Sequence, residues 1–399
     1  MSSTEKLRAR FAEALSHENI KSFLDVLECM NVQVDTPDAQ GRTMLWHCVR
    51  TRDHKKVDFL IRCGAEPDVT DNEGMTPIHV ALMQGEFIDE LIARMLLGSR
   101  PKTSISEILQ GGLSLDQLFL YHADISDSVN AIRFLLKLGA DVKTLNEDRE
   151  TPLMRAAHYG ELKTMKILEA VNLLLSSEKL NVNCQDRKGR SAFWLSVHLG
   201  RDKISERFLN DSRVDVNFRG GSVIPQWQTT PLYIACYRRN IQMVSCILAA
   251  TNFPRVDPNI QGDMGMSPLR AAAYQGIYEL VAMLLKADGI RINAVDEGEN
   301  DPLWLAIQIH SVSVVQLFLN DCRLDINCQN NRKGDTYLIA AALYGNVPLV
   351  NKLLKFKGIE LSRRNKEDES AVEIAHKLNH HQIVQMIIQS MADRGADRL

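Results

Sequence analysis

The sequence predicts an all-α protein, a curved and elongated stack of about 10–11 helix-turn-helix units with finger loops between them. A seven-residue phrase recurs ten times along the 399 residues. Its starts lie 33, 42, 33, 40, 39, 37, 34, 35 and 34 residues apart, which indicates a structural repeat of about 33 residues or slightly more. The phrases are TMLWHCV from Thr43, TPIHVAL from Thr76, LFLYHAD from Leu118, TPLMRAA from Thr151, SAFWLSV from Ser191, TPLYIAC from Thr230, SPLRAAA from Ser267, DPLWLAI from Asp301, TYLIAAA from Thr336 and SAVEIAH from Ser370.

Each phrase predicts the first helix of its unit. Thr or Ser at the first position can cap a helix, and proline at the next position lies in the first turn, where its missing N–H is not needed. The third, sixth and seventh residues are apolar and are expected to be buried, as in Leu303, Ala306 and Ile307. A glycine such as Gly276 often follows and allows the backbone to reverse.

The residues after each phrase predict a second helix. Apolar pairs recur four positions apart, for example Val314 and Val315 with Phe318 and Leu319, so they share one helix face. One pair of helices cannot cover such a face alone, and stacking against the next unit buries it. The predicted core is therefore continuous along the stack.

The units are joined by predicted finger loops with the pattern D-x-x-G, as in Asp186 to Gly189. Three fingers have a different residue at the glycine position: Arg149, Glu299 and Asp368. We expect these three tips to use another turn geometry, because glycine is the residue that most easily adopts a left-handed turn.

The phrase T-P-L-H-x-A-A at this period resembles the ankyrin-repeat family over nearly the whole chain. We expect an N-terminal capping unit at 1–42, a repeat array at 43–369, and a C-terminal capping unit with a frayed tail at 370–399. Two insertions interrupt the period, at 98–114 and 218–229. Added loops often carry binding specificity in repeat proteins, although the first insertion is more readily interpreted as a tolerated surface loop.

Composition narrows the possible functions. The net charge is −3, and basic stretches such as 187–219 are nearly balanced by acids, so nucleic-acid binding is not expected. The chain contains no apolar run of membrane length and begins without a secretory signal, which favours a cytoplasmic monomer. The eight cysteines form no CxxC pair, as is typical of a reducing compartment.

Catalytic and metal-binding motifs are also missing from the sequence. His47 precedes Cys48, but adjacent residues on a helix point about 100° apart, and Cys48 occupies an apolar position. The histidines have no metal-ligand spacing, so we expect no cofactor and no enzymatic activity. The alternative is an enzyme with a site assembled from the divergent segment 98–136. The family resemblance implies that His79, the phrase histidine, is a structural hydrogen-bonding residue.

The resemblance also implies where a partner binds. Ankyrin proteins use a concave surface formed by finger tips and the exposed end of the first helix. Three tryptophans replace the phrase histidine and are expected to pack between units: Trp46, Trp194 and Trp304. Tyr, Trp and Arg dominate binding hot spots. They cluster at the surface positions of units five to seven, which gives the predicted protein-binding residues Arg187, Lys188, Arg190, Trp227, Tyr237, Arg238 and Tyr274.

We therefore expect a protein-binding scaffold whose partner is a protein of unknown identity. The extended links between units resemble the degenerate repeats of ankyrin proteins from intracellular bacteria and protists. Members of that group are often delivered into host cells, so the resemblance would make the chain an effector in the host cytosol and its partner a host protein.

Overall fold

The computed structural model describes residues 34–83, 90–98, 109, 113–123, 129–159, 165–221, 228–251, 254–262, 265–295, 300–330 and 333–396. Within these residues the chain is all-helical, with 20 helices and only isolated β-bridges. It divides into two compact units, one up to Asp186 and one from Arg187 onward. The predicted N-terminal cap at 1–42 lies largely outside the described residues.

The first unit contains four described helix pairs. The helices are α3 (Met44–Arg50), α4 (His54–Arg62), α5 (Pro77–Met83), α6 (Glu90–Gly98), α8 (Leu115–Ala123), α9 (Val129–Lys137), α10 (Pro152–Tyr159) and α11 (Met165–Leu175). In each pair the first helix packs against the second, α3 packs against α5, and α8 packs against α10, while a hydrogen bond between His122 and the carbonyl of Leu82 joins α8 to α5.

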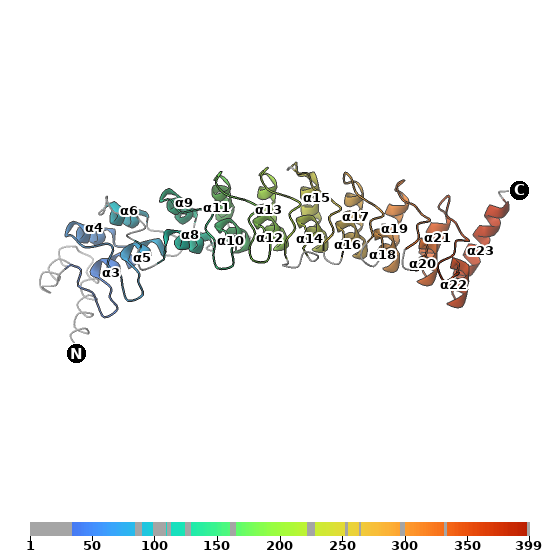
Figure 1. Cartoon of the computed structure of the whole chain (residues 1–399), viewed down its shortest axis with the longest axis horizontal. Helices are drawn as coiled ribbons and strands as arrows, with labels where there is room; N and C mark the ends of the chain where they lie inside the picture. The colour runs from blue at the N-terminus through green and yellow to red at the C-terminus, as the bar shows by residue number, and fades with distance from the viewer. Residues whose placement is uncertain are drawn as a thin grey trace. The chain divides into compact units, whose positions relative to one another are not determined.

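The second unit contains six helix pairs in two layers. Figure 1 shows the first helices of the pairs in one row and the second helices in another, and contacts within each row and between the rows agree with this arrangement. The helices are α12 (Ala192–His198), α13 (Asp202–Leu209), α14 (Pro231–Tyr237), α15 (Ile241–Ala249), α16 (Pro268–Tyr274), α17 (Tyr278–Leu285), α18 (Pro302–Gln308), α19 (Val312–Leu319), α20 (Tyr337–Leu343), α21 (Val347–Leu354), α22 (Ala371–Lys377) and α23 (His381–Ala396).

The predicted capping of the first helices is confirmed. Thr230 Oγ1 accepts a hydrogen bond from the backbone N–H of Tyr233 at 3.2 Å, and Pro231 occupies the first helical position. Such a bond satisfies one of the backbone donors that a helix start leaves unpaired. The same cap is made by Thr43, Ser191, Ser267, Asp301, Thr336 and Ser370.

The predicted core is confirmed as well. The third, sixth and seventh residues of the unit that starts at Asp301 are buried, and so are the second-helix residues Val314, Val315, Phe318 and Leu319. The three tryptophans at the histidine position are also buried. Their side chains therefore belong to the packing of the helices, as expected.

The third phrase begins four residues earlier than predicted. Ser114 caps α8, because its Oγ accepts a hydrogen bond from the backbone N–H of Gln117 at 3.2 Å. The predicted start of the phrase was Leu118. The contacts between units agree with this register, because His79 Nε2 bonds the carbonyl of Leu113, directly before the new start. The start of this repeat was misplaced because its sequence departs from the consensus, and the apolar residues at 118–120 resemble those of the phrase.

The expectation of another turn geometry at two finger tips is wrong. Arg149 and Asp368 adopt positive φ angles of 62° and 60°, close to the 70° of the finger glycine Gly189. A left-handed conformation costs a non-glycine residue about 1–2 kcal/mol, and the repeated packing of the fingers compensates for it. Glu299, the third such residue, lies outside the described residues.

An asparagine ladder connects the extended links of the second unit. Asn259 Nδ2 donates to the carbonyl of Gly289 at 2.9 Å, and its Oδ1 accepts from Arg291 N–H at 2.7 Å. Asn217 and Asn327 bond the following link in the same two-bond manner. Each asparagine thereby replaces the backbone pairing of a β-sheet.

The predicted fraying of the C-terminal tail is wrong for its first six residues. α23 continues to Ala396, and Arg394 Nη2 donates to the carbonyl of Leu354 at 2.7 Å while Nη1 donates to that of Ile359 at 2.8 Å. Leu354 ends α21, so Arg394 satisfies a carbonyl that this helix leaves unpaired. The outer helix of this last unit carries the exposed polar residues Gln382, Gln385 and Gln389, as the end of an open repeat stack requires.

Candidate functional site

Exposed apolar side chains of the second unit gather where the first helix of a pair turns into the second. Among its described residues, eight large apolar side chains are exposed, and six of them lie at such turns. Tyr237 is 64% exposed and Tyr274 is 54% exposed, at the ends of α14 and α16. The six residues, which we call the turn patch, are Tyr237, Ile241, Tyr274, Tyr278, Leu343 and Leu378.

The densest part of the turn patch is held by contacts between neighbouring turns. Gln275 Nε2 donates to the carbonyl of Cys236 at 3.3 Å, and Arg239 Nε donates to Gln275 Oε1 at 2.7 Å. These bonds join the end of α14 to the end of α16. The ring of Tyr237 stacks on Tyr233 with centroids 6.2 Å apart. The first two turns therefore form one connected surface.

The backbone at this surface has an unusual conformation for its sequence. Arg239 has a positive φ of 60°, at a position that glycine occupies in some repeats, as at Gly276 and Gly345, and where His310 and Asn379 are also left-handed. Glycine adopts this conformation without a steric penalty, whereas arginine does not. The left-handed turn is therefore a recurring feature of the repeat, and at this turn it carries an arginine whose Nε donates to Gln275 Oε1.

The predicted binding residues fall into two groups in the structure. Tyr237, Arg238 and Tyr274 are exposed and lie together at the turns after α14 and α16. The predicted residues Arg187, Lys188 and Arg190 belong to the finger at 187–190, which precedes α12. Fingers lie at the N-terminal ends of the first helices, whereas the turns lie at their C-terminal ends. A helix of seven residues separates the two edges by about 10 Å. Trp227 lies outside the described residues.

Four members of the turn patch are not among the predicted binding residues: Ile241, Tyr278, Leu343 and Leu378. Ile241 and Tyr278 begin the second helices α15 and α17, whereas only residues around each phrase were considered as surface positions. The sequence does contain an indication of these two residues. Each is a large apolar residue at the first position of a second helix, two positions before the first buried residue of that helix. Arg239 was missed because its left-handed backbone conformation is not encoded by residue type.

Cys48 and His79 belong to the core, whereas His47 is partly exposed and bonds Asp38 Oδ2 at 3.0 Å. Burial raises the pKa of the Cys48 thiol to about 12, so this thiol stays protonated at neutral pH. His79 bonds Thr76 Oγ1 at 2.7 Å and the carbonyl of Leu113 at 2.8 Å, as its structural role predicts. No cluster of three His, Cys, Asp or Glu side chains suited to a metal occurs in the described part of the chain. Much of the alternative enzyme segment 98–136 lies outside that part.

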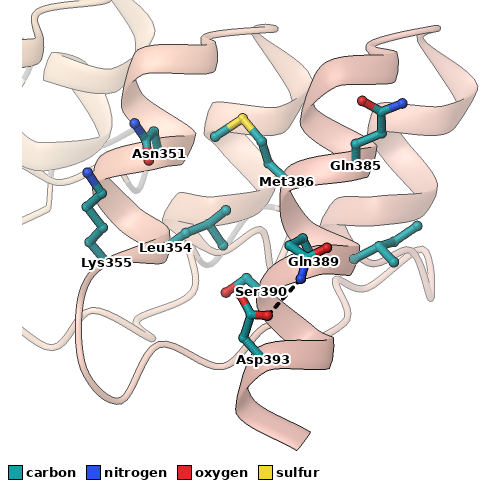
Figure 2. Close-up of a pocket in the computed structure, with 9 residues that line it drawn as sticks. Asn351, Leu354, Lys355, Gln385, Met386, Gln389, Ser390 and Asp393 are labelled. Atoms are coloured by element: carbon teal, nitrogen blue, oxygen red, sulfur yellow. Dashed lines mark hydrogen bonds between the residues drawn. The ribbon is translucent and has the colours of Figure 1, made fainter. Parts of the chain in front are cut away.

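A groove of about 770 Å³ lies between α21 and α23 (Figure 2). Leu354 and Met386 contribute its apolar surface, and Gln389 Nε2 donates to Asp393 Oδ1 at 2.7 Å along its wall. Its ionisable lining groups are one lysine, Lys355, and one carboxylate, Asp393. This composition provides a mixed polar and apolar surface.

Comparison with known proteins agrees with the fold. The family model described as ankyrin repeats (three copies) matches residues 11–107, 45–143, 206–296 and 303–397. These matches cover more than half of the chain, and the protein belongs to the ankyrin-repeat family. The ankyrin repeat domain of Bcl-3 has a similar structure, with a TM-score of 0.51 at 22% identity over 61% of this chain and 100% of that domain.

Relatives with assigned names share only part of their length with this chain. Transient receptor potential cation channel subfamily A member 1 of Homo sapiens is 24% identical over 49% of the chain and 17% of its own length. E3 ubiquitin-protein ligase KEG of Arabidopsis thaliana is 22% identical over 98% of the chain and 23% of its own length. The probable 26S proteasome regulatory subunit p28 of Saccharomyces cerevisiae is 29% identical over 38% of the chain and 62% of its own length. The chain therefore spans less than a quarter of the first two relatives.

The helices were also compared with the dimensions of a lipid bilayer. A membrane-spanning helix needs about 20 apolar residues. None of the described helices has both the length and the apolar character that such a span requires.

Proposed function

We propose that the chain is a protein-binding scaffold, and that the turn patch of the second unit contacts its partner. The main contact would be formed by Tyr237, Ile241, Tyr274 and Tyr278, with Arg238 at its edge. The single observation that supports this most strongly is the concentration of exposed apolar side chains at these turns, against a buried core elsewhere.

The residue types favour a protein partner. Tyrosine combines a large apolar face with a polar hydroxyl and few rotatable bonds, so it loses little entropy when it binds. Arginine and tyrosine are enriched at binding hot spots, and contiguous exposed apolar surface is uncommon on proteins that bind nothing. Membership of the ankyrin-repeat family adds support, because a rigid stack presents side chains at a regular spacing.

The finger cations would contribute a second contact. The exposed side chains of Arg187 and Lys188 lie on the finger before α12. They would pair with acidic groups of the partner, mainly increasing the rate of association and its sensitivity to salt. A partner that contacts both the finger at 187–190 and the turn patch would have to extend along the length of the first helices.

The test is a comparison of matched tyrosine variants. Partners would be purified from cells of the source organism with the full chain, and their affinity then measured for Tyr237→Ala, Tyr274→Ala and the control Tyr121→Ala. Tyr121 is also an exposed tyrosine on a first helix, but it lies in the first unit. We expect each of the two patch variants to weaken binding about tenfold, as hot-spot truncations do. Equal affinity for all three variants would reject the turn patch.

The narrower expectation of a bacterial effector is a separate hypothesis. The relatives named above come from an animal, a plant and a yeast, and they do not support it. Recovery of a host protein by the same purification, with loss of binding in the patch variants, would favour it.

A further inference from the structure

A second candidate site lies among the fingers and links of the second unit, apart from the turn patch. It is a pocket of about 420 Å³. Its described lining contains two arginines, two amide side chains and three small residues, and no carboxylate occurs among these described residues. The lining residues are Arg219, Asn259, Gln261, Gly262, Gly265, Arg291 and Ala294.

Arg291 is the central observation. Its side chain is exposed, and its guanidinium makes no ion pair or hydrogen bond to any residue that the structure describes. Most other arginines of the second unit behave differently: Arg323, for example, forms a bidentate pair with Asp321. On the neighbouring link, the carboxylate of Asp257 accepts hydrogen bonds from Asn259. The positive charge of Arg291 is therefore available to a ligand.

The pocket is built by the asparagine ladder. Asn259 holds the backbone of Gly289 and Arg291 against its own link, and Gln261 Nε2 donates to the carbonyl of Val295 at 3.0 Å. These bonds fix the spacing of the two links that form the walls. Arg219 also lines the pocket, and its Nη2 donates to the carbonyl of Gln228 at 3.3 Å. The backbone is hydrogen-bonded beside both arginines, because the N–H of Arg291 donates to Asn259 Oδ1 and the N–H of Gly220 donates to the carbonyl of Thr229.

The pocket also continues the row of finger cations. The backbone of Gly220, next to Arg219, lies so close to the preceding finger that an added Cβ would meet the carbonyl oxygen of Gly189 at 2.4 Å. Arg190 follows Gly189 directly. An extended segment running across these fingers would meet positive groups from Arg187 to Arg291.

We propose that this pocket binds an oxyanion carried by the side chain of an extended peptide segment of a partner protein. Guanidinium groups form their strongest hydrogen bonds with carboxylates and phosphates, and two arginines can hold both oxygens of such a group. The volume exceeds that of one anion and leaves room for the flanking peptide backbone. A glutamate carboxylate and a phosphoserine phosphate share this chemistry, and the experiment below distinguishes them. The pocket site goes beyond the turn patch and does not depend on it.

The test uses fluorescein-labelled peptides and the full chain at low ionic strength, where surface charge pairs are strongest. The probes are the heptapeptide GSEEESG, the same peptide with glutamine for each glutamate, and the same peptide with phosphoserine for the central glutamate. Unlabelled inorganic phosphate serves as competitor. Protein variants are Arg291→Gln and Arg219→Gln, with Arg255→Gln as the control for charge, because Arg255 lies on a neighbouring link and does not line the pocket.

We expect the glutamate or the phosphoserine peptide to bind, with the glutamine peptide at least about tenfold weaker. Arg291→Gln should weaken the acidic peptides about tenfold and Arg255→Gln less than twofold. Tighter binding of the phosphoserine peptide, with competition by phosphate, would identify phosphate as the natural group. Tighter binding of the glutamate peptide, without competition by phosphate, would identify carboxylate. Equal effects of all three arginine variants, or no binding by any acidic peptide, would overturn the proposal. Neither outcome depends on the tyrosine variants, so failure of the turn patch and failure of this pocket are distinguishable.

Discussion

The indole Nε1 of Trp194 donates a hydrogen bond to the backbone carbonyl of Thr229, 2.9 Å away in the next repeat. His79 reaches Leu113 in the same way from the corresponding position of its own repeat. At Trp194 tryptophan therefore replaces the phrase histidine, because its indole N–H lies at hydrogen-bond distance from a carbonyl of the next repeat. Here the substitution keeps the bond and adds apolar surface to the stack.

The first prediction concerns the glycine that faces Trp194. Gly221 has a φ of +94°, and a Cβ added to it would lie 2.3 Å from Cζ2 of Trp194. Gly221→Ala should lower the thermal unfolding temperature by several degrees, because the methyl group displaces the indole and adds strain. Gly358→Ala is the control, since its φ is +89° and nothing lies within 4 Å of its added Cβ. Equal shifts for the two variants would mean that backbone strain alone is responsible.

The second prediction concerns the asparagine ladder. Asn259→Ala removes three side-chain hydrogen bonds, two of them to the following link, and should destabilise the second unit by about 1–2 kcal/mol. The amide of Arg291, which donates to Asn259 Oδ1, should exchange with solvent distinctly faster in an NMR hydrogen-exchange experiment. Asn293→Ala is the control, because Asn293 occupies the matching place on the following link and its side chain is exposed. Unchanged exchange at Arg291 would contradict the ladder.

A third prediction uses the left-handed finger tips. Arg149→Gly should raise the free energy of unfolding by about 0.5–1 kcal/mol, because relief of the steric strain exceeds the extra chain entropy that glycine gains when unfolded. Asp368→Gly should act in the same direction. Thermal unfolding of both variants measures the effect. A lower unfolding temperature for Arg149→Gly would show that the arginine side chain contributes more than its strained backbone costs.

The fourth prediction concerns the capping box that begins α22. Hydrogen bonds from the backbone N–H and the hydroxyl of Ser370, followed by those from Arg364, lower the pKa of Glu373 to about 2. A pKa lowered by folding stabilises the protein above the ordinary value of 4.5, and this contribution is lost as the pH falls through about 2. The side-chain carboxyl ¹³C shift of Glu373, followed by NMR, should titrate in that range.

A variant distinguishes the source of this shift. Ser370→Ala removes the hydroxyl donor but keeps the backbone donor, so the pKa of Glu373 should rise only part of the way toward 4.5. A titration of the wild-type carboxyl near its ordinary value would refute the capping box in solution.

The fifth prediction separates buried from exposed thiols. Cys48 and Cys236 are buried and Cys63 and Cys322 are exposed in the folded chain. Iodoacetamide at mildly alkaline pH should therefore alkylate Cys63 and Cys322 first, since only an accessible thiolate reacts. Mass spectrometry of the digested protein gives the order. Early alkylation of Cys48 would indicate local unfolding of α3 or a reactive thiol that the core packing does not explain.

Most of the repeat pattern could be read from residue types. Thr230 caps its helix and Pro231 follows it because both preferences are local, acting within one turn of backbone. Burial of Phe318 and Leu319 likewise follows from their four-residue spacing. The same reasoning misplaced the start of α8, where apolar residues imitate the phrase and only bonds to the neighbouring repeats reveal Ser114 as the cap.

The candidate sites depend on contacts that the sequence does not display. Tyr237 and Tyr274 were predicted as surface residues. They form one patch with Ile241 and Tyr278 because a hydrogen bond between Arg239 and Gln275 holds the two turns together. The pocket around Arg291 was not predicted at all, because its walls come from links more than 30 residues apart in the chain.

The amino-acid sequence by itself determined the repeat, the helix caps and the apolar faces, since each depends on neighbours within a few residues. The tertiary structure alone decided which loop residues adopt left-handed backbone, which asparagines join adjacent links, and which exposed side chains lie together. The physical reason is that these features are stabilised by contacts between repeats, where one residue meets another some 30–40 positions away and residue type alone does not specify the pairing.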